Sequence, residues 1–162
     1  MIITVFTDAS FYWRQKVAAY ACWAKADGKT VRISGVAKEQ LTSANHAEMA
    51  AFANGIFLAV RSFAPKVGDR IIIQTDCQDA MSAFGLHPKI KRRKPLEAYQ
   101  QKTVDFVSAE VERCGFKIEA RYVKAHNGTG DKRSAVNEWC DAAAKKAARD
   151  QLAKLKYEEL AK

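Results

Sequence analysis

Four acidic side chains stand where the chain is expected to pass from one element to the next, and two of them follow strands. Asp8 ends the apolar, β-branched run at residues 2–6, and Asp76 ends a second such run at 70–75. Runs of this kind are typical of strands buried on both faces of a sheet. Neighbouring strands lie about 4.8 Å apart, so carboxylates at adjacent carboxyl ends can share divalent metal ions.

Glu48 and Asp141 are the other two acids. Glu48 lies in the first turn of a helix expected at 45–62, which connects the two strands and starts near the same edge of the sheet. Asp141 borders the apolar stripe of a helix expected from residue 134 onwards. Converging carboxylates repel one another unless cations bind, and hard oxygen ligands suit Mg²⁺ or Mn²⁺. Two such ions can activate a water and stabilise the leaving oxygen in phosphodiester hydrolysis.

Each acid also has a structural interpretation that needs no metal. Asp8 can cap a turn, and Asp76 can cap the short helix that follows it, with Asp79 as its capping-box partner. Glu48 can form a capping box with Asn45, the expected N-cap of its helix. Asp141 can form an i,i+4 ion pair with Lys145. The metal site is preferred because all four acids are expected at one place.

The rest of the pattern supplies the elements that must hold these acids. Strands are expected at 1–10, 17–26, 30–37, 70–75 and 116–123, and helices at 45–62, 77–84, 96–113 and from 134 to near the C-terminus. A turn at Asp27-Gly28 indicates a hairpin, and the short link at 10–16 extends it to a three-stranded antiparallel meander. A right-handed β-crossover-β unit makes the first and fourth strands parallel.

Composition bounds the class of protein. At 162 residues the chain is most simply one domain, and no apolar run approaches the roughly 20 residues of a membrane span. We see no signal peptide. The four cysteines form no C-x-x-C pair, so reduced thiols in a cytoplasmic protein are expected. A monomer is also expected. The net charge of +9 favours a nucleic-acid partner, although solubility alone explains it about equally well.

Five motifs in order resemble those of type 1 ribonuclease H. They are F-T-D-A-S at 6–10, N-H-A-E at 45–48, T-D-C-Q at 75–78, V-K-A-H at 123–126 and N-E-W-C-D at 137–141. The resemblance implies a ribonuclease H-like α/β fold over residues 1–162, with a mixed five-stranded sheet and helices on both faces. It also implies two-metal cleavage of the RNA strand of RNA–DNA hybrids, with Asp8, Glu48, Asp76 and Asp141 as the metal-binding residues.

Further residues take expected roles from the same resemblance. His126 matches the histidine that assists proton transfer or product release, and its unperturbed pKa of about 6.5 suits that role; an exposed loop histidine is the alternative. Ser10, Asn45 and Gln78 match positions that contact the hybrid, where amides can bond minor-groove edges and 2′-hydroxyls. His46, by contrast, is expected to be a surface or capping residue, as is His87.

A basic loop and the end of the chain complete the expectations. The loop at 89–95 carries five cations in six residues, which are expected to attract substrate phosphates or else form a solvated loop: Lys89, Lys91, Arg92, Arg93 and Lys94. The last helix is expected to extend over about 150–162, where it either projects, frays or mediates an interaction.

Two departures from the family pattern bear on the substrate. Residues 11–16 contain no glycine where many members carry a Gly/Pro-rich loop that binds the RNA strand, and Ala44 stands where an asparagine is common. Arg14, Lys16 and the neighbouring aromatic rings are candidate phosphate and stacking contacts, or the rings form a packing cluster. A DNA nuclease of the same fold, such as a junction resolvase or transposase-like enzyme, therefore stays open, as does a non-catalytic hybrid-binding module.

Overall fold

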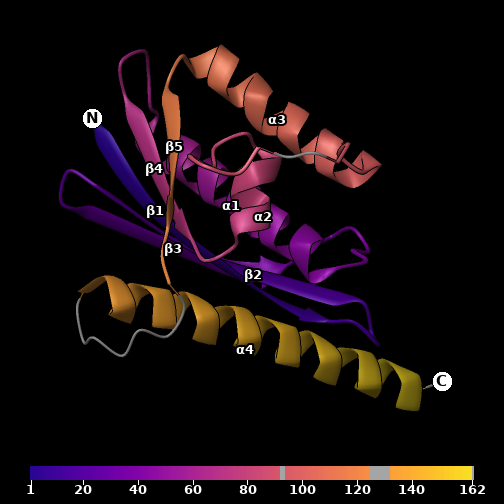
Figure 1. The fold of residues 1–162 in the computed structure, drawn as a ribbon. Coiled ribbons are helices and arrows are strands. Elements are labelled where there is room, and N and C mark those ends of the chain that lie inside the picture. Colours follow the sequence, from indigo (N-terminus) through magenta and orange to yellow (C-terminus); the bar gives the residue numbers. More distant parts are fainter. Residues whose placement is uncertain (92–93, 125–131, 162) are drawn as a thin grey trace.

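A mixed five-stranded sheet forms the centre of the molecule in the computed structural model, which describes residues 1–91, 94–124 and 132–161 (Figure 1). The strands are β1 (Ile2–Tyr12), β2 (Val17–Ala26), β3 (Lys29–Val36), β4 (Arg70–Thr75) and β5 (Lys117–Tyr122), and the helices are α1 (Ala44–Phe63), α2 (Gln78–Ala83), α3 (Ala98–Cys114) and α4 (Lys132–Leu160). The strand order is β3-β2-β1-β4-β5, antiparallel from β3 to β1 and parallel from β1 to β5. The predicted meander and the parallel neighbours β1 and β4 are confirmed.

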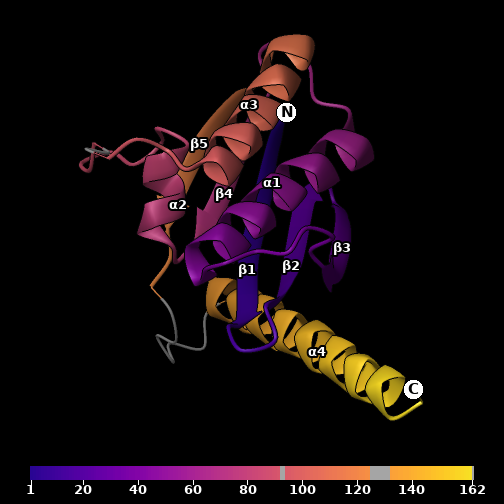
Figure 2. The ribbon, with the colours of Figure 1, turned by 90° about the vertical axis from the view of Figure 1, so that its right-hand side faces the viewer.

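The described helices cover both faces of the sheet. Helix α4 lies on one face, while α1, α2 and α3 lie on the other (Figure 2). Alternate residues of β1 face the two layers: Ile3 and Val5 pack in the cluster under α1, and Phe6 packs with Cys140 and Ala144 of α4. Because β1 is central and buried on both sides, its sequence is continuously apolar rather than alternating.

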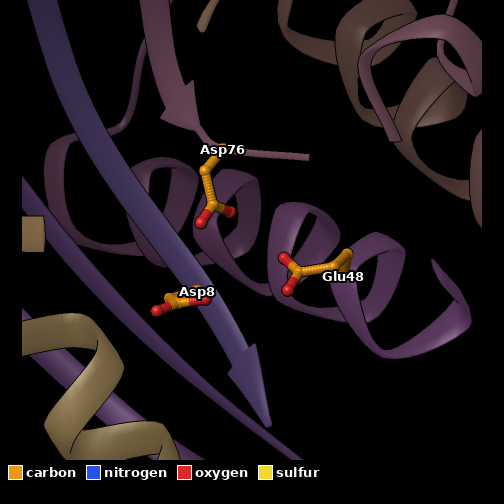
Figure 3. Close-up of side chains that lie close together, drawn as sticks. All are labelled: Asp8, Glu48 and Asp76. Atoms are coloured by element: carbon orange, nitrogen blue, oxygen red, sulfur yellow. The ribbon is translucent and has the colours of Figure 1, made fainter. Parts of the chain in front are cut away.

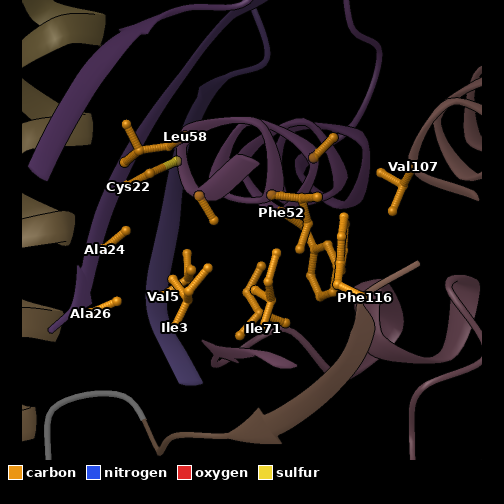
Figure 4. Close-up of a cluster of buried hydrophobic side chains, with 14 residues drawn as sticks. Ile3, Val5, Cys22, Ala24, Ala26, Phe52, Leu58, Ile71, Val107 and Phe116 are labelled. Atoms are coloured by element: carbon orange, nitrogen blue, oxygen red, sulfur yellow. The ribbon is translucent and has the colours of Figure 1, made fainter. Parts of the chain in front are cut away.

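The largest buried cluster lies between the sheet and α1 (Figure 4). Phe52 of α1 stacks on Phe84 with ring centroids 4.3 Å apart, and Phe116 and Ile71 are fully or almost fully buried beside it. Burial of each such side chain contributes about 1.5–3 kcal/mol, so this layer holds α1 firmly against β1 and β4.

Gly55 allows α1 to approach the sheet closely. A Cβ atom at this position would lie 2.5 Å from the Thr7 Cγ2 atom and 2.9 Å from the Val5 Cγ1 atom. These distances are shorter than any ordinary carbon–carbon contact, so a side chain here would push α1 away from β1. The close approach holds the N-terminal part of α1, which carries Glu48 just after its first turn, near the strands.

Strand β1 continues past the position where the sequence predicts its end. Its parallel pairing with β4 stops at Phe6–Gln74, but its antiparallel pairing with β2 runs on to Tyr12–Val17. Asp8 therefore lies inside a strand, two residues beyond the last parallel pair. The interpretation of Asp8 as a turn cap is wrong, because a four-residue turn follows only after Tyr12.

The predicted helix caps are wrong at two positions. Ser43, not Asn45, is the N-cap of α1, and its hydroxyl accepts a hydrogen bond from the His46 N–H. Cys77, not Asp76, is the N-cap of α2 and accepts through its sulfur. In both cases a neighbouring residue makes the cap, so neither Asn45 nor Asp76 is the N-cap of its helix.

The two histidines outside the motifs differ from each other. His46 is buried, with its Nε2 atom 2.9 Å from a Glu97 carboxylate oxygen and its ring against Tyr99. The expectation of a surface or capping residue is wrong here, because α3 folds back over the start of α1 and covers the ring. His87 does cap, since its Nδ1 atom accepts from two backbone N–H groups of the following loop.

Helix α4 continues without a break to Leu160. Its second half is anchored to the β1–β2 hairpin, where Leu152 and Leu155 pack in one cluster with Tyr12. The last residues extend beyond the sheet (Figure 1), and Tyr157 and Leu160 are 75% and 79% exposed. Over the described ranges, none of the helices has the length and apolarity needed to cross a membrane.

Candidate metal centre

Three of the predicted acids meet at the carboxyl edge of the parallel strands. Asp8 comes from β1, Glu48 from α1 and Asp76 from the residue that follows β4, and their carboxylates point toward one another (Figure 3). One oxygen of each lies within 4.8 Å of the others. Asp8 and Asp76 each stand two residues beyond the last β1–β4 pair, so the parallel register itself places them together.

The electrostatics of this triad disfavour three bare charges. Burial, followed by the nearby Asp76, raises the pKa of Asp8 from its ordinary value of 3.8 to about 7. Burial, followed by Asp8 and Asp76, raises the pKa of Glu48 well above its usual range. The Ala9 N–H, which donates to Asp8 Oδ1 over 2.8 Å, and the positive charge of Lys145 lower the pKa of Asp8 and so offset part of this rise.

The donor set fits a divalent cation. The Glu48 Oε2 atom is buried, and no residue that the structure describes gives it a hydrogen bond. A buried acceptor without a partner costs about 1–3 kcal/mol or more, particularly when it carries charge. Carboxylate oxygens without accompanying nitrogen or sulfur ligands are typical of Mg²⁺ or Mn²⁺ sites. Asp8, Glu48 and Asp76 can therefore hold such an ion.

Asp141 is near the triad but not within it. It lies on α4, where its carboxylate forms an ion pair with Lys145 over 2.8 Å, as its structural interpretation predicts. Its charge nevertheless contributes to the raised pKa of Asp8, so it faces the same edge of the sheet. The predicted convergence of four acids is thus found for three. The fourth, Asp141, is outside the triad and is paired with Lys145.

The expected hybrid-contacting residues are distributed around the triad. Ser10 lies on β1 opposite Ala19, and Gln78 is the first residue of α2. The Asn45 amide donates to the Asp79 carboxylate over 2.9 Å, so Asp79 holds this amide instead of forming the expected capping box with Asp76. Sequence reasoning did not find this contact, because it joins two helices through residues 34 positions apart.

The basic loop approaches the same region. Lys91 and Lys94 line a hollow of about 580 Å³ together with Asn45, Asp79 and Ser43. Lys89 comes just before the residues of this loop that line the hollow, and its backbone N–H donates to His87 Nδ1. Arg92, Arg93 and His126 lie outside the described residues.

The glycine-free segment at 11–16 divides its aromatic residues between two roles. Phe11 packs in the cluster under the start of α1, and Tyr12 packs against the second half of α4. Trp13 is 69% exposed, with the Arg14 guanidinium 5.2 Å from its ring centroid. The packing interpretation therefore holds for the first two rings, and Trp13 remains on the surface.

The comparisons with known proteins agree with this geometry. The RNase H family model matches residues 1–149. The chain belongs to the RNase H family. No curated protein matches it. Its sheet order and helix placement are those of the RNase H fold, as the motifs predict.

Solved RNase H structures resemble the chain in fold at low sequence identity. The N-terminal RNase H domain of Rv2228c from Mycobacterium tuberculosis has a TM-score of 0.69 and 15% identity, with 95% of this chain and 98% of that chain covered. RNase H1 from the halophilic archaeon Halobacterium salinarum has a TM-score of 0.62 and 19% identity, with 93% of this chain and 99% of that chain covered. LC11-RNase H1, solved in complex with an RNA/DNA hybrid, has a TM-score of 0.65 and 15% identity, with 93% of this chain and 99% of that chain covered.

Proposed function

We propose that this RNase H family chain is a metal-dependent endonuclease that hydrolyses the RNA strand of RNA–DNA hybrids. The observation that carries the proposal is the triad of Asp8, Glu48 and Asp76, whose oxygens lie within 4.8 Å of one another, together with the buried Glu48 Oε2 atom, which receives no hydrogen bond from a described residue. Family membership and the hybrid in the LC11-RNase H1 structure support the choice of substrate.

The acids would bind two Mg²⁺ ions, with Mn²⁺ as a substitute. Asp8, Glu48, Asp76 and Asp141 would hold the ions, Glu48 would also orient the 2′-hydroxyl, and Asp141 would have to give up its ion pair with Lys145 to take part. Bound ions of this kind supply an activated water and stabilise the leaving oxygen. The protein itself contributes burial, which keeps the carboxylates ordered and strengthens their interactions with charge.

Neighbouring residues would position the hybrid and move protons. His126 would assist proton transfer or product release. Ser10, Asn45 and Gln78 would contact the hybrid, and the Asp79 contact orients the Asn45 amide in advance. The cations of the loop at 89–95 would bind phosphates: Lys89, Lys91, Arg92, Arg93 and Lys94.

A DNA nuclease of the same fold is the second candidate. The observation that favours it is the β1–β2 hairpin, whose turn contains no glycine and presents the exposed ring of Trp13. A backbone that cannot approach an RNA strand closely at this turn would weaken selection for hybrids. A non-catalytic hybrid-binding module is disfavoured, because all four family acids are present.

Cleavage of a substrate panel separates these functions. The chain is incubated with Mg²⁺ and matched hybrid, duplex DNA, branched DNA and double-stranded RNA. We expect hybrid cleavage that leaves 3′-hydroxyl and 5′-phosphate ends. Asp8→Asn should abolish it while leaving hybrid binding largely intact, and Asp150→Asn, on an exposed acid paired with Lys146, is the matched control. Preferential cleavage of DNA would favour the second candidate, and full activity of Asp8→Asn would refute the metal site.

A further inference from the structure

Three basic side chains share one side of α4. Lys145, Arg149 and Lys156 stand at i, i+4 and i+11, which places them within a narrow arc at 100° per residue. All three are exposed. The buried side of the same helix, formed by Cys140, Ala144 and Ala148, packs on the sheet. We call the three basic residues the α4 flank.

The α4 flank begins beside the metal centre. Lys145 pairs with Asp141, and its positive charge lowers the pKa of Asp8, so it lies close to the triad. Arg149 lies near enough to act electrostatically on Lys145. The row of cations therefore begins beside the acids and leads away from them along the helix.

The side of α4 about 100° around the helix from the flank carries paired charges. Lys146 and Asp150 form an ion pair there over 2.6 Å, and both line a hollow of about 560 Å³ with Ser34 of β3. The acid at position 150 thus neutralises charge on the β3 side and not on the α4 flank. In the part of the chain that the structure describes, neither Arg149 nor Lys156 has a carboxylate partner.

The tip of the β1–β2 hairpin lies beside the second half of this flank. Tyr12 packs in one cluster with Leu152, which stands between Arg149 and Lys156 on the helix. The next two residues present the exposed Trp13 ring and the Arg14 guanidinium above it. The cations of the α4 flank and the Trp13–Arg14 pair therefore stand on two elements that pack together through Tyr12 and Leu152, and basic groups with aromatic rings are what surfaces that track a nucleic-acid strand combine.

We propose that the α4 flank is a second nucleic-acid contact, which binds backbone phosphates of the hybrid outside the cleavage position. This inference rests on the proposed function for its substrate. From Lys145 to Lys156 the helix rises about 17 Å, which corresponds to about five nucleotides of one strand at 3.4 Å each. The described parts of the basic loop, 89–91 and 94–95, lie beyond α2, far from α4 (Figure 2), so the two basic surfaces would contact different parts of the duplex.

Two double variants of one helix test the proposal. Arg149→Ala with Lys156→Ala removes two cations from the α4 flank, and Lys146→Ala with Lys154→Ala removes two cations from other sides of the same helix. Both are made in the Asp8→Asn background, so that binding of a long hybrid is measured without cleavage. Circular dichroism and thermal unfolding show that each variant is folded.

The flank variant is expected to bind the long hybrid about tenfold more weakly, and the slope of log affinity against log salt should fall in magnitude by about 1–2, because each phosphate contact contributes about 0.9. The loss should be smaller for a short hybrid that ends near the cleavage position. The control variant should keep the parent affinity and slope. With Asp8 intact, the flank variant should raise KM for the long hybrid.

Equal losses in the two double variants would mean that net charge alone acts, and would overturn the proposal. An unchanged salt slope in the flank variant would overturn it as well. Failure of the proposed function is a separate result: a chain with Asp8 intact that cleaves no hybrid would refute that function, while the binding difference between the two variants would still report on the flank.

Discussion

Asp8→Asn is expected to stabilise the metal-free protein, even though it removes a central residue of the site. Burial and the charge of Asp76 raise the pKa of Asp8 from 3.8 to about 7, so ionisation of this carboxyl is unfavourable in the folded state. Asparagine has the same shape, keeps an oxygen to accept the Ala9 N–H and carries no charge. The variant therefore removes a cost that only the folded protein bears.

The expected gain depends on pH with a definite sign. An acid whose folded pKa is raised destabilises the protein increasingly as pH rises from the unfolded pKa to the folded one, and the full cost is present above the folded value. At 1.36 kcal/mol per pKa unit, the shift from 3.8 to about 7 corresponds to about 4 kcal/mol at pH 8, about 1.7 at pH 5 and about 0.6 at pH 4. The Asp8 charge also raises the pKa of Glu48, so its removal makes ionisation of Glu48 less costly and adds to the gain in stability at high pH.

Urea denaturation in the presence of a chelator measures this gain. The free energy of unfolding of the variant should exceed that of the parent at pH 8, and the difference should shrink toward pH 4. Asp150→Asn serves as the control, because Asp150 is exposed and its ion pair contributes at most about 1 kcal/mol. A variant no more stable than the parent at pH 8, or a gain that does not change with pH, would refute the reasoning.

Three further expectations concern the frame of the site. Gly55→Ala should lower the free energy of unfolding by about 1–3 kcal/mol, because the added methyl group overlaps β1; an unchanged urea midpoint would contradict the close packing of α1. Ser43→Ala should cost about 1 kcal/mol in thermal unfolding, and an Asn45→Ala variant that costs more would restore the other capping assignment. Lys145→Ala should tighten Mg²⁺ binding in calorimetry by up to about fivefold, since an exposed ion pair contributes at most about 1 kcal/mol; Lys146→Ala is the matched control, and weaker binding would contradict the competition.

Much of the frame was predictable from local pattern. The runs that became β1 and β4 are continuously β-branched and apolar, and right-handed crossover by the intervening helix makes them parallel neighbours. That register places Asp8 and Asp76 at one edge, so two of the three triad residues followed from strand pattern and chain order. Glu48 followed from its place near the start of the crossover helix, although the structure puts it just after the first turn because α1 begins at Ala44.

Contacts between distant segments decided what local pattern could not. Periodicity identifies His46 only as a residue near a helix start, whereas its burial depends on Glu97 and Tyr99, about 50 positions away. The extension of β1 to Tyr12 depends on its pairing with β2. Ser43 and Asn45 can both cap a helix. Ser43 is the N-cap because its backbone is extended, while Asn45 is already inside the helix.

The sequence alone therefore determined the family, the order of the elements and the identity of the acids, because these depend on residue type and short-range spacing. Tertiary structure decided which acids meet in the metal-free protein. Asp8, Glu48 and Asp76 converge because the parallel register and the close approach of α1 bring them together. Asp141 stays with Lys145, since an ion pair one turn away on its own helix is available without any movement of α4.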